Sequence, residues 1–278
     1  MSVWMAMLLG LLQGVTVFLP ISNSGHLAVV ENLLKLDVPA GGLFGFFMNL
    51  STFVSIFMVF RKDLGRLLQE GAEFLRGQTD EDPMSDGRLT PPIRLLYFII
   101  VGTLPLILSA PIGKRIDVLM GNTLFIGFAL IAMGILLFVT DKFLKPGKKS
   151  EKTMNVKDAF FIGLGQAFAV IPGLSRTGTT VTVGLVCGLK RDFAVRFSIF
   201  LSLPALIVSI LSGFFSLFKS GTEWSSFFVY LIAFVVSTLT GYLAIQILRM
   251  ASRKRKLRNF GYYLWFAGIV TIVLTLIL

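Results

Sequence analysis

Six stretches without a single charged side chain constrain this chain more than any other feature. At about 1.5 Å per residue, a helix over each stretch crosses or nearly crosses a hydrocarbon core of roughly 30 Å. The stretches are Leu43–Phe60, Leu95–Ile112, Thr123–Val139, Phe197–Phe218, Phe227–Leu248 and Phe260–Leu278. The composition agrees, because 55% of the residues are hydrophobic and only 15% are charged, outside the range of ordinary soluble domains. The sequence therefore predicts an all-α integral membrane protein with six transmembrane helices.

Two further apolar segments are each interrupted by a proline and a polar turn. After Pro20 and the turn that follows it, the run "LAVVENLLKL" adds about 15 Å of helix, which is too short to cross a bilayer. The segment Ala159–Arg191 repeats this plan, with a break at Pro172 and a second short leg. We expect both segments to be re-entrant helical hairpins. Such broken backbone is tolerated at membrane depth only where it is buried in protein or lines a wet cavity.

The two hairpins can be aligned with a single one-residue gap, which indicates an internal repeat. The aligned pairs are Gly10 with Gly163, Gln13 with Gln166, Val17 with Val170, Pro20 with Pro172, Ser22 with Ser175, Ser24 with Thr177 and Gly25 with Gly178. Three spans follow each hairpin, so the halves have opposite orientations in the membrane. We expect a single membrane domain over residues 1–278, with repeat halves 1–140 and 155–278 and a cytoplasmic linker at 141–154. Inverted repeats of this kind place a site at their interface, near the midplane.

The distribution of basic residues predicts the orientation. Most of the 26 Lys and Arg residues fall in segments 61–94, 142–157, 190–196 and 249–258, all on one side if the hairpins do not cross. The positive-inside rule makes that side cytoplasmic and places both termini outside. The hairpins then enter from opposite sides, and we expect their tips to meet. The run "RKRKLR" at 253–258 and the net charge of +11 fit anionic lipid headgroups, so nucleic acid is not an expected partner.

Arg176 lies at the tip of the second hairpin, and His26, the only histidine, lies at the tip of the first. An arginine at membrane depth is costly enough to be a functional-site hypothesis by default. We expect the two tips to form one buried pocket. Structural roles stay open for the neighbouring residues: Ser22 and Ser24 can cap helices, and Gln13, like its equivalent in the second hairpin, can bond between helices as readily as it can contact a substrate.

The strings "GLLQGVTVFLPISNSGH" and "AVIPGLSRTGTT" resemble the two signatures of the undecaprenyl pyrophosphate phosphatases, the bacterial family associated with bacitracin resistance. The similarity covers the whole chain and includes "NLSTFVSIFMVFRKDL". The resemblance implies six spans, two re-entrant hairpins in inverted repeat, and a pocket open to the outer side of the bacterial plasma membrane. It also implies an enzyme that removes the terminal phosphate of undecaprenyl diphosphate, so that the carrier lipid is recycled for cell-wall synthesis.

The resemblance implies site residues as well as two departures from the family pattern. The family residues implicated in phosphate binding and hydrolysis match His26, Ser22, Ser175, Arg176 and Thr180. A signature glutamate is replaced by Val17, and a signature serine by Asn23. The missing glutamate is the carboxylate expected to hold a divalent cation or to activate water. Mg²⁺ or Ca²⁺ is therefore a cofactor that the family implies, but we see no complete set of protein ligands for a metal.

The remaining residues predict a cradle for a diphosphate. Arg176 can bind phosphate oxygens in bidentate fashion, and the short legs begin with helix N-termini that favour an anion. The candidate phosphate contacts are Gln13, Asn23, Ser24, Ser175, Thr177, Gly178 and Thr180, and the candidate catalytic residues are Ser22, His26 and Arg176. His26 could take a proton from water or attack phosphorus itself.

Two functions remain open. The first is a phosphatase that acts on a polyprenyl diphosphate lipid, with membrane lipids as its other partners and a homodimer as an open possibility. The second is a lipid-phosphate transporter, a flippase or a non-catalytic binder, because an inverted repeat suits alternating access and Val17 removes the expected carboxylate. A phosphatase of the phosphatidic acid type needs a second histidine and is set aside.

Overall fold

The computed structural model describes residues 2–34, 42–77, 91–145, 147–219 and 226–277. These residues are helical apart from connecting turns and one isolated bridge between Lys149 and Leu189. Among them, six helices are long and apolar enough to cross a membrane. They are α3 (Gly42–Leu75), α4 (Pro91–Thr103) with its 3₁₀ continuation η1 (Leu104–Ile112), α6 (Thr123–Phe143), α9 (Arg191–Leu201) continued by α10 (Leu203–Lys219), α11 (Phe227–Arg253) and α12 (Arg258–Ile277). The predicted class, an all-α multi-pass membrane protein, is confirmed.

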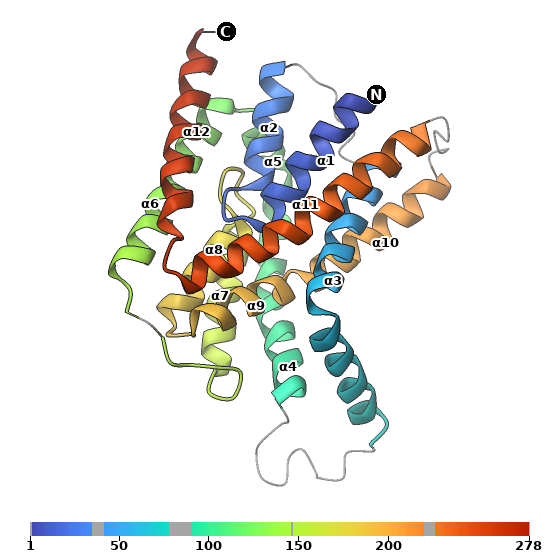
Figure 1. Ribbon diagram of the computed structural model, residues 1–278, viewed down its shortest axis with the longest axis vertical. Coiled ribbons are helices and arrows are strands. Elements are labelled where there is room, and N and C mark those ends of the chain that lie inside the picture. Colours follow the sequence, from blue (N-terminus) through green and yellow to red (C-terminus); the bar gives the residue numbers. More distant parts are fainter. Residues whose placement is uncertain (1, 35–41, 78–90, 146, 220–225, 278) are drawn as a thin grey trace.

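The two interrupted segments form helical hairpins. The first consists of α1 (Val3–Phe18) and α2 (Asn23–Leu34), the second of α7 (Val156–Phe168) and α8 (Arg176–Val186), and the short α5 (Gly113–Met120) lies outside both. In Figure 1 the first hairpin opens toward the end of the molecule that carries both termini, and the second opens toward the opposite end. This arrangement is compatible with two re-entrant hairpins that enter from opposite sides.

The same local chemistry makes both hairpin turns. Ser22 and Ser175 each precede a short second leg, and their Oγ atoms accept hydrogen bonds from the backbone N–H of Gly25 at 3.2 Å and of Gly178 at 3.1 Å. This is helix N-capping by serine. Gly173 in the second turn has a φ of +92°, a conformation that glycine adopts without the steric cost of a side chain. Each turn therefore reverses the chain and starts a new helix at once.

The two turns meet in the interior of the protein, as the sequence predicts. The Thr177 hydroxyl donates to the Val17 carbonyl at 3.4 Å. A Cβ atom at Gly25 would lie 3.0 Å from the Cα of Gly173, so the backbones of the two turns are in near contact. A side chain at Gly25 would therefore separate the turns.

The helix pairings follow a pseudo-two-fold pattern. The first leg of each hairpin packs on the second span of the other half, α1 on α11 and α7 on α4, and the third spans α6 and α12 pack on one another. A Cβ at Gly10 would lie 2.5 Å from the Ala233 carbonyl oxygen, and one at Gly163 would lie 2.3 Å from that of Gly102. The equivalent glycines thus allow equivalent close packing. The pattern is compatible with the inverted repeat.

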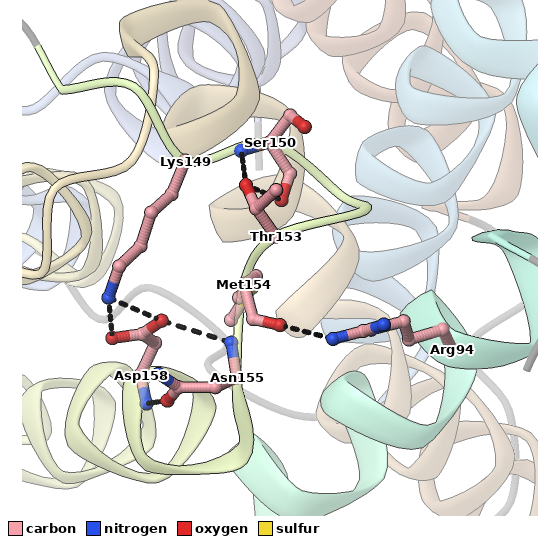
Figure 2. Close-up of polar contacts among 7 residues, drawn as sticks. All are labelled: Arg94, Lys149, Ser150, Thr153, Met154, Asn155 and Asp158. Carbon is pink, nitrogen blue, oxygen red and sulfur yellow. Dashed lines mark hydrogen bonds and ion pairs between the residues drawn. The ribbon is translucent and has the colours of Figure 1, made fainter. Parts of the chain in front are cut away.

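Polar contacts fix the start of the second hairpin to its surroundings (Figure 2). Asn155 and Asp158 form a capping box at the start of α7, and Lys149 Nζ lies 2.8 Å from Asp158 Oδ1. Arg94 of α4 donates to the Met154 carbonyl at 2.8 Å. Because the Asp158 side chain is buried, removal of a partner would leave polar groups without compensation. These contacts hold the base of the hairpin while its tip reaches the first turn.

The Gly173→Ala variant tests the packing of the second turn. A Cβ there would lie 2.5 Å from Ala129 Cβ, and alanine at φ +92° is strained. These two effects together cost about 2 kcal/mol or more, and we expect the Tm in detergent to fall by about 4 °C or more. Gly65→Ala is the control, because no heavy atom lies within 4 Å of its Cβ position. Equal melting temperatures for the two variants would contradict the close packing of the turn.

Candidate functional site

A cavity of about 230 Å³ lies where the two hairpin turns meet α3, α9 and α10. Its volume is equivalent to several water molecules at about 30 Å³ each, which suits a phosphate-sized group rather than a long hydrocarbon chain. Its lining consists of Gln13, Thr16, Val17, Phe18, Asn23, Ser24, Asn49, Thr52, Ala169, Leu174, Ser175, Arg176, Thr177, Ile199, Ser202, Ala205, Leu206 and Ser209. Both turns and two spans, α3 and the continuous α9–α10 span, therefore contribute to one site.

Arg176 is the only charged residue in this lining. Within the described residues, its guanidinium makes no hydrogen bond or ion pair. Three neighbours in the lining, Gln13, Ser24 and Asn49, likewise have side chains without a hydrogen-bond partner in the described part of the chain. Arg176 is exposed, and none of the four side chains is among the buried groups that lack a partner in the described residues, so their polar atoms are open to the cavity. Four such groups on one cavity indicate a site for a polar ligand, and the guanidinium selects an anion.

The start of α8 strengthens the preference for an anion. Helix α8 begins at Arg176 and runs for 11 residues, with Ser175 as its N-cap. Its positive N-terminal end adjoins the cavity through Ser175, Arg176 and Thr177, which all belong to the lining. A helix N-terminus favours negative charge. The charge of Arg176 and the helix dipole therefore act in the same direction.

Asn23 replaces the serine that the resemblance implies and still lines the cavity. Its Oδ1 atom lies 2.7 Å from the Thr16 hydroxyl, a contact that joins α1 to the start of α2. The contact holds the carboxamide against the wall of the cavity. Amide and hydroxyl groups both offer hydrogen-bond donors, so the substitution preserves the polar character of this wall.

Several predicted site residues are not in the cavity lining, because their polar atoms serve the turns themselves. Ser22 and Gly178 belong to the two capping contacts and are almost fully buried. The Thr180 hydroxyl is 2.8 Å from the Arg176 carbonyl and also contacts Ser198 Oγ. In this structure these three residues shape the turns. The other predicted phosphate contacts, Gln13, Asn23, Ser24, Ser175 and Thr177, lie at the cavity together with Arg176.

His26 also lies outside the lining, and both of its ring nitrogens have partners. Nδ1 is 2.9 Å from the Ser22 carbonyl oxygen, and Nε2 is 2.9 Å from the hydroxyl of Tyr263 on α12. In this structure the imidazole therefore faces Tyr263 and does not line the cavity that contains Arg176. The physical reason is that the short leg α2 presents His26 to α12, where the phenol supplies a hydrogen bond.

The two equivalent glutamines differ in their surroundings. Gln13 lines the cavity, whereas Gln166 is fully buried and is absent from the lining. Neither side-chain atom of Gln166 finds a hydrogen-bond partner within the described ranges. The alternative that Gln166 bonds between helices is thus not realised here. The two glutamines thus differ in their relation to the cavity, because only Gln13 belongs to its lining.

Sequence reasoning missed part of the lining. Asn49 and Thr52 come from α3, and Ser202 and Ser209 come from the region of α9 and α10. One signal could have identified Asn49: a carboxamide within an uncharged span is costly unless it meets a partner or lines a polar cavity. The serines and Thr52 carry no such signal, because small hydroxyl side chains commonly bond to the preceding helical turn.

The lining does not fit a resident divalent cation. Mg²⁺ and Ca²⁺ prefer several oxygen ligands, and carboxylates supply the charge. The cavity lining holds no Asp or Glu, and in the described part of the chain no group of three or more His, Cys, Asp or Glu residues could hold a metal ion. Gln13, Asn23 and Asn49 offer neutral oxygens only. The protein groups present here favour an anion over a cation.

Six apolar helices and a polar cavity with one positive group in the described residues define a multi-pass membrane protein with a site suited to an anionic group. A family model described as bacitracin resistance protein BacA matches residues 6–270. An undecaprenyl-diphosphatase of Methanosphaera stadtmanae is 34% identical over 284 residues, 98% of each chain. Another from Methanobrevibacter smithii is 33% identical over 276 residues, which are 97% of this chain and 96% of the relative. One from Rubrobacter xylanophilus is 33% identical over 274 residues, 98% of each chain. The chain belongs to the BacA family.

Proposed function

We propose that this protein is an undecaprenyl-diphosphatase, which hydrolyses the terminal phosphate of a polyprenyl diphosphate lipid. The relatives named undecaprenyl-diphosphatase support the reaction. One observation in the structure carries the proposal: Arg176 and three unpaired polar side chains converge on a cavity of about 230 Å³. This volume accepts the phosphate end of the lipid and leaves the hydrocarbon tail outside, among membrane lipids.

The binding step uses the positive charge of Arg176 and hydrogen-bond donors of the cavity lining. Arg176 binds oxygens of the terminal phosphate, and the amides of Asn23 and Asn49 donate further hydrogen bonds. Negative charge spreads over the phosphoryl oxygens in the transition state, so groups already directed at those oxygens lower the barrier. In this proposal Arg176 contributes most, because it alone in the lining carries a charge.

The hydrolytic step needs a base as well. A water oxygen forms a bond to the terminal phosphorus, the bond from phosphorus to the bridging oxygen breaks, and the bridging oxygen leaves on the lipid monophosphate. His26 accepts the proton of the water at Nε2, the nitrogen that is paired with Tyr263 at 2.9 Å in this structure. A histidine base contributes about 10²–10⁴-fold to such a step. His26 must therefore exchange its tyrosine partner for water during turnover.

The Val17→Glu variant tests the missing carboxylate. Val17 lines the cavity, so a glutamate there would place a carboxylate among the neutral oxygens and could complete a cation site. We expect phosphate release by this variant to rise about tenfold or more when Mg²⁺ or Ca²⁺ is added to the EDTA-treated protein. Wild type and Val17→Gln, the uncharged control, should respond less than about twofold. An equal response of all three would show that Val17 is not at the reacting phosphate.

The orientation in the membrane is part of the proposal. The helices α1 and α12 place both termini at one end, and the basic turn between α11 and α12 lies away from that end (Figure 1). By the positive-inside rule, this supports termini on the outer side, and the cavity is proposed to open to that side. The substrate would then be taken from the outer leaflet.

A second function is favoured by one observation. The cavity lining lacks both a carboxylate and His26, so it could bind a lipid phosphate without hydrolysing it. A non-catalytic binder or a lipid-phosphate transporter on the same fold would use Arg176 in the same way. Inverted repeats are common in transporters, so the fold does not separate the two functions.

A phosphate-release assay separates them. Purified protein is incubated with undecaprenyl diphosphate, with EDTA or with added Mg²⁺, and inorganic phosphate is measured. Binding of the same lipid is measured in parallel. The phosphatase proposal predicts release that depends on Arg176. Binding that depends on Arg176 without any release would establish the second function.

A further inference from the structure

His26 and Tyr263 form a pair that links the first hairpin to the last helix. The Tyr263 hydroxyl lies 2.9 Å from His26 Nε2. Their rings are nearly parallel, with 9° between the planes and 5.7 Å between the centroids. The contact joins residues 237 positions apart in the chain. The cavity lining contains neither residue.

The second ring nitrogen fixes the tautomer of the imidazole. Nδ1 lies 2.9 Å from the Ser22 carbonyl oxygen, and a carbonyl only accepts hydrogen bonds. Nδ1 must therefore carry the proton, and Nε2 of the neutral ring carries the lone pair. The Tyr263 hydroxyl then donates to Nε2. The position of Ser22 is itself fixed, because the residue is buried and its Oγ accepts a hydrogen bond from the Gly25 N–H.

The residue after the turn glycine makes a comparable contact in both hairpins. Thr179 follows Gly178 as His26 follows Gly25, and the Thr179 hydroxyl lies 3.7 Å from the sulfur of Met133 on α6. Each second leg thus presents the residue after its turn glycine to the third span of the other half. Among the described residues, the first half pairs an imidazole with a phenol at this position, and the second half pairs a threonine hydroxyl with a thioether. The equivalent contact in the second half is thus made without a titratable side chain.

The neighbouring aromatic residues hold α12 in place independently of His26. Tyr262 packs on Phe138 at 5.8 Å and on Trp265 at 5.6 Å between ring centroids. The contact with Phe138 fastens α12 to α6, whereas Trp265 belongs to α12 itself. Tyr262 makes no contact with His26 among the described residues, so it offers a matched control for the loss of a single phenolic hydroxyl.

We propose that Tyr263 is a positioning residue, which holds the His26 ring with the Nε2 lone pair directed at its hydroxyl, while the Ser22 carbonyl keeps the proton on Nδ1. The catalytic meaning of this role rests on the proposed phosphatase function, because a base that acts through Nε2 needs this tautomer. The hydrogen bond from the Tyr263 hydroxyl orients the imidazole and occupies Nε2 until a water molecule replaces the phenol. The pair itself is a property of the resting protein and can be tested without turnover.

Nitrogen NMR tests the pair directly, because the chain contains one histidine. Protein labelled with ¹⁵N-histidine, at a pH where the ring is neutral, should give a protonated Nδ1 signal and an unprotonated Nε2 signal shifted by a hydrogen bond. In Tyr263→Phe the Nε2 signal should move toward the position of a free lone pair, and in Tyr262→Phe it should stay. A proton on Nε2 in the wild type, or identical spectra for wild type and Tyr263→Phe, would overturn the proposal.

Kinetics provide the second readout. In phosphate-release assays, Tyr263→Phe should lower kcat by about tenfold with KM within about twofold, since the substrate cavity is untouched. Tyr262→Phe should match the wild type in both constants. A change in KM alone would contradict a positioning role. If the wild-type protein releases no phosphate, the proposed function fails, whereas the NMR spectra still decide whether Tyr263 positions His26.

Discussion

Replacement of Arg176 by alanine is expected to lower the rate of phosphate release by about a thousandfold. Among the residues that the structure describes, the guanidinium is the only charge in the cavity lining, so it alone is placed there to neutralise the developing charge on the phosphoryl group. Loss of a single donor in such sites costs about 10²–10³-fold, and an arginine on a transferring phosphoryl group contributes about 10³–10⁵-fold. The measurement is the initial rate of release from undecaprenyl diphosphate.

Two further variants separate charge from geometry. Arg176→Lys keeps the charge but loses the bidentate fork, so its rate should lie between those of alanine and wild type. Arg253→Gln is the control, because Arg253 is an exposed residue paired with Asp192, and such pairs contribute little. Its rate should stay within about twofold of the wild type. An Arg176→Ala protein that is folded and retains more than about a tenth of the wild-type rate would refute the role of the guanidinium.

Replacement of His26 by glutamine is expected to separate hydrolysis from binding. We expect phosphate release to fall by about 10²–10⁴-fold, because the base is lost. The affinity for undecaprenyl monophosphate should change by less than about threefold, since His26 is absent from the cavity lining, and a loss of catalysis without a loss of binding marks a group that acts in the transition state. Single-turnover release and a binding titration measure the two effects.

The two ways in which this prediction can fail have different meanings. A wild-type rate in His26→Gln would show that the histidine only joins α2 to α12 through Tyr263. A parallel loss of binding would show that His26 moves into the cavity and contacts the lipid phosphate. In that second case Arg176 alone would not be enough for binding. The variants of Arg176 and His26 would then have the same phenotype.

The parts of the fold that depend on local chemistry could be predicted from the sequence. Uncharged stretches predicted the six spans, because the length and polarity of a membrane helix are set by the bilayer. Pro20 and Pro172, each followed by a serine cap, predicted the two turns. Arg176 could be placed in a polar cavity because an arginine at membrane depth has few alternatives. Its position in the lining follows from that energetic argument.

The parts that depend on packing between distant segments could not be predicted. Tyr263 lies in an aromatic-rich stretch of α12, and nothing in that stretch distinguishes it from Tyr262 until α2 is placed beside it. Thr180 was expected to contact phosphate because it matches a family residue implicated in phosphate binding, but its hydroxyl bonds to the preceding turn and to Ser198. Hydroxyl residues can satisfy themselves locally, so their type does not reveal whether they face a ligand.

The central claim is that the cavity between the two hairpin turns holds the phosphate end of a lipid against Arg176. An experimental structure of the protein with a non-hydrolysable diphosphonate analogue of undecaprenyl diphosphate tests it most directly. The account predicts the terminal phosphonate within hydrogen-bonding distance of the Arg176 guanidinium, between the turn at Ser24 and the turn at Ser175. A diphosphonate bound elsewhere, with Arg176 untouched, would contradict it.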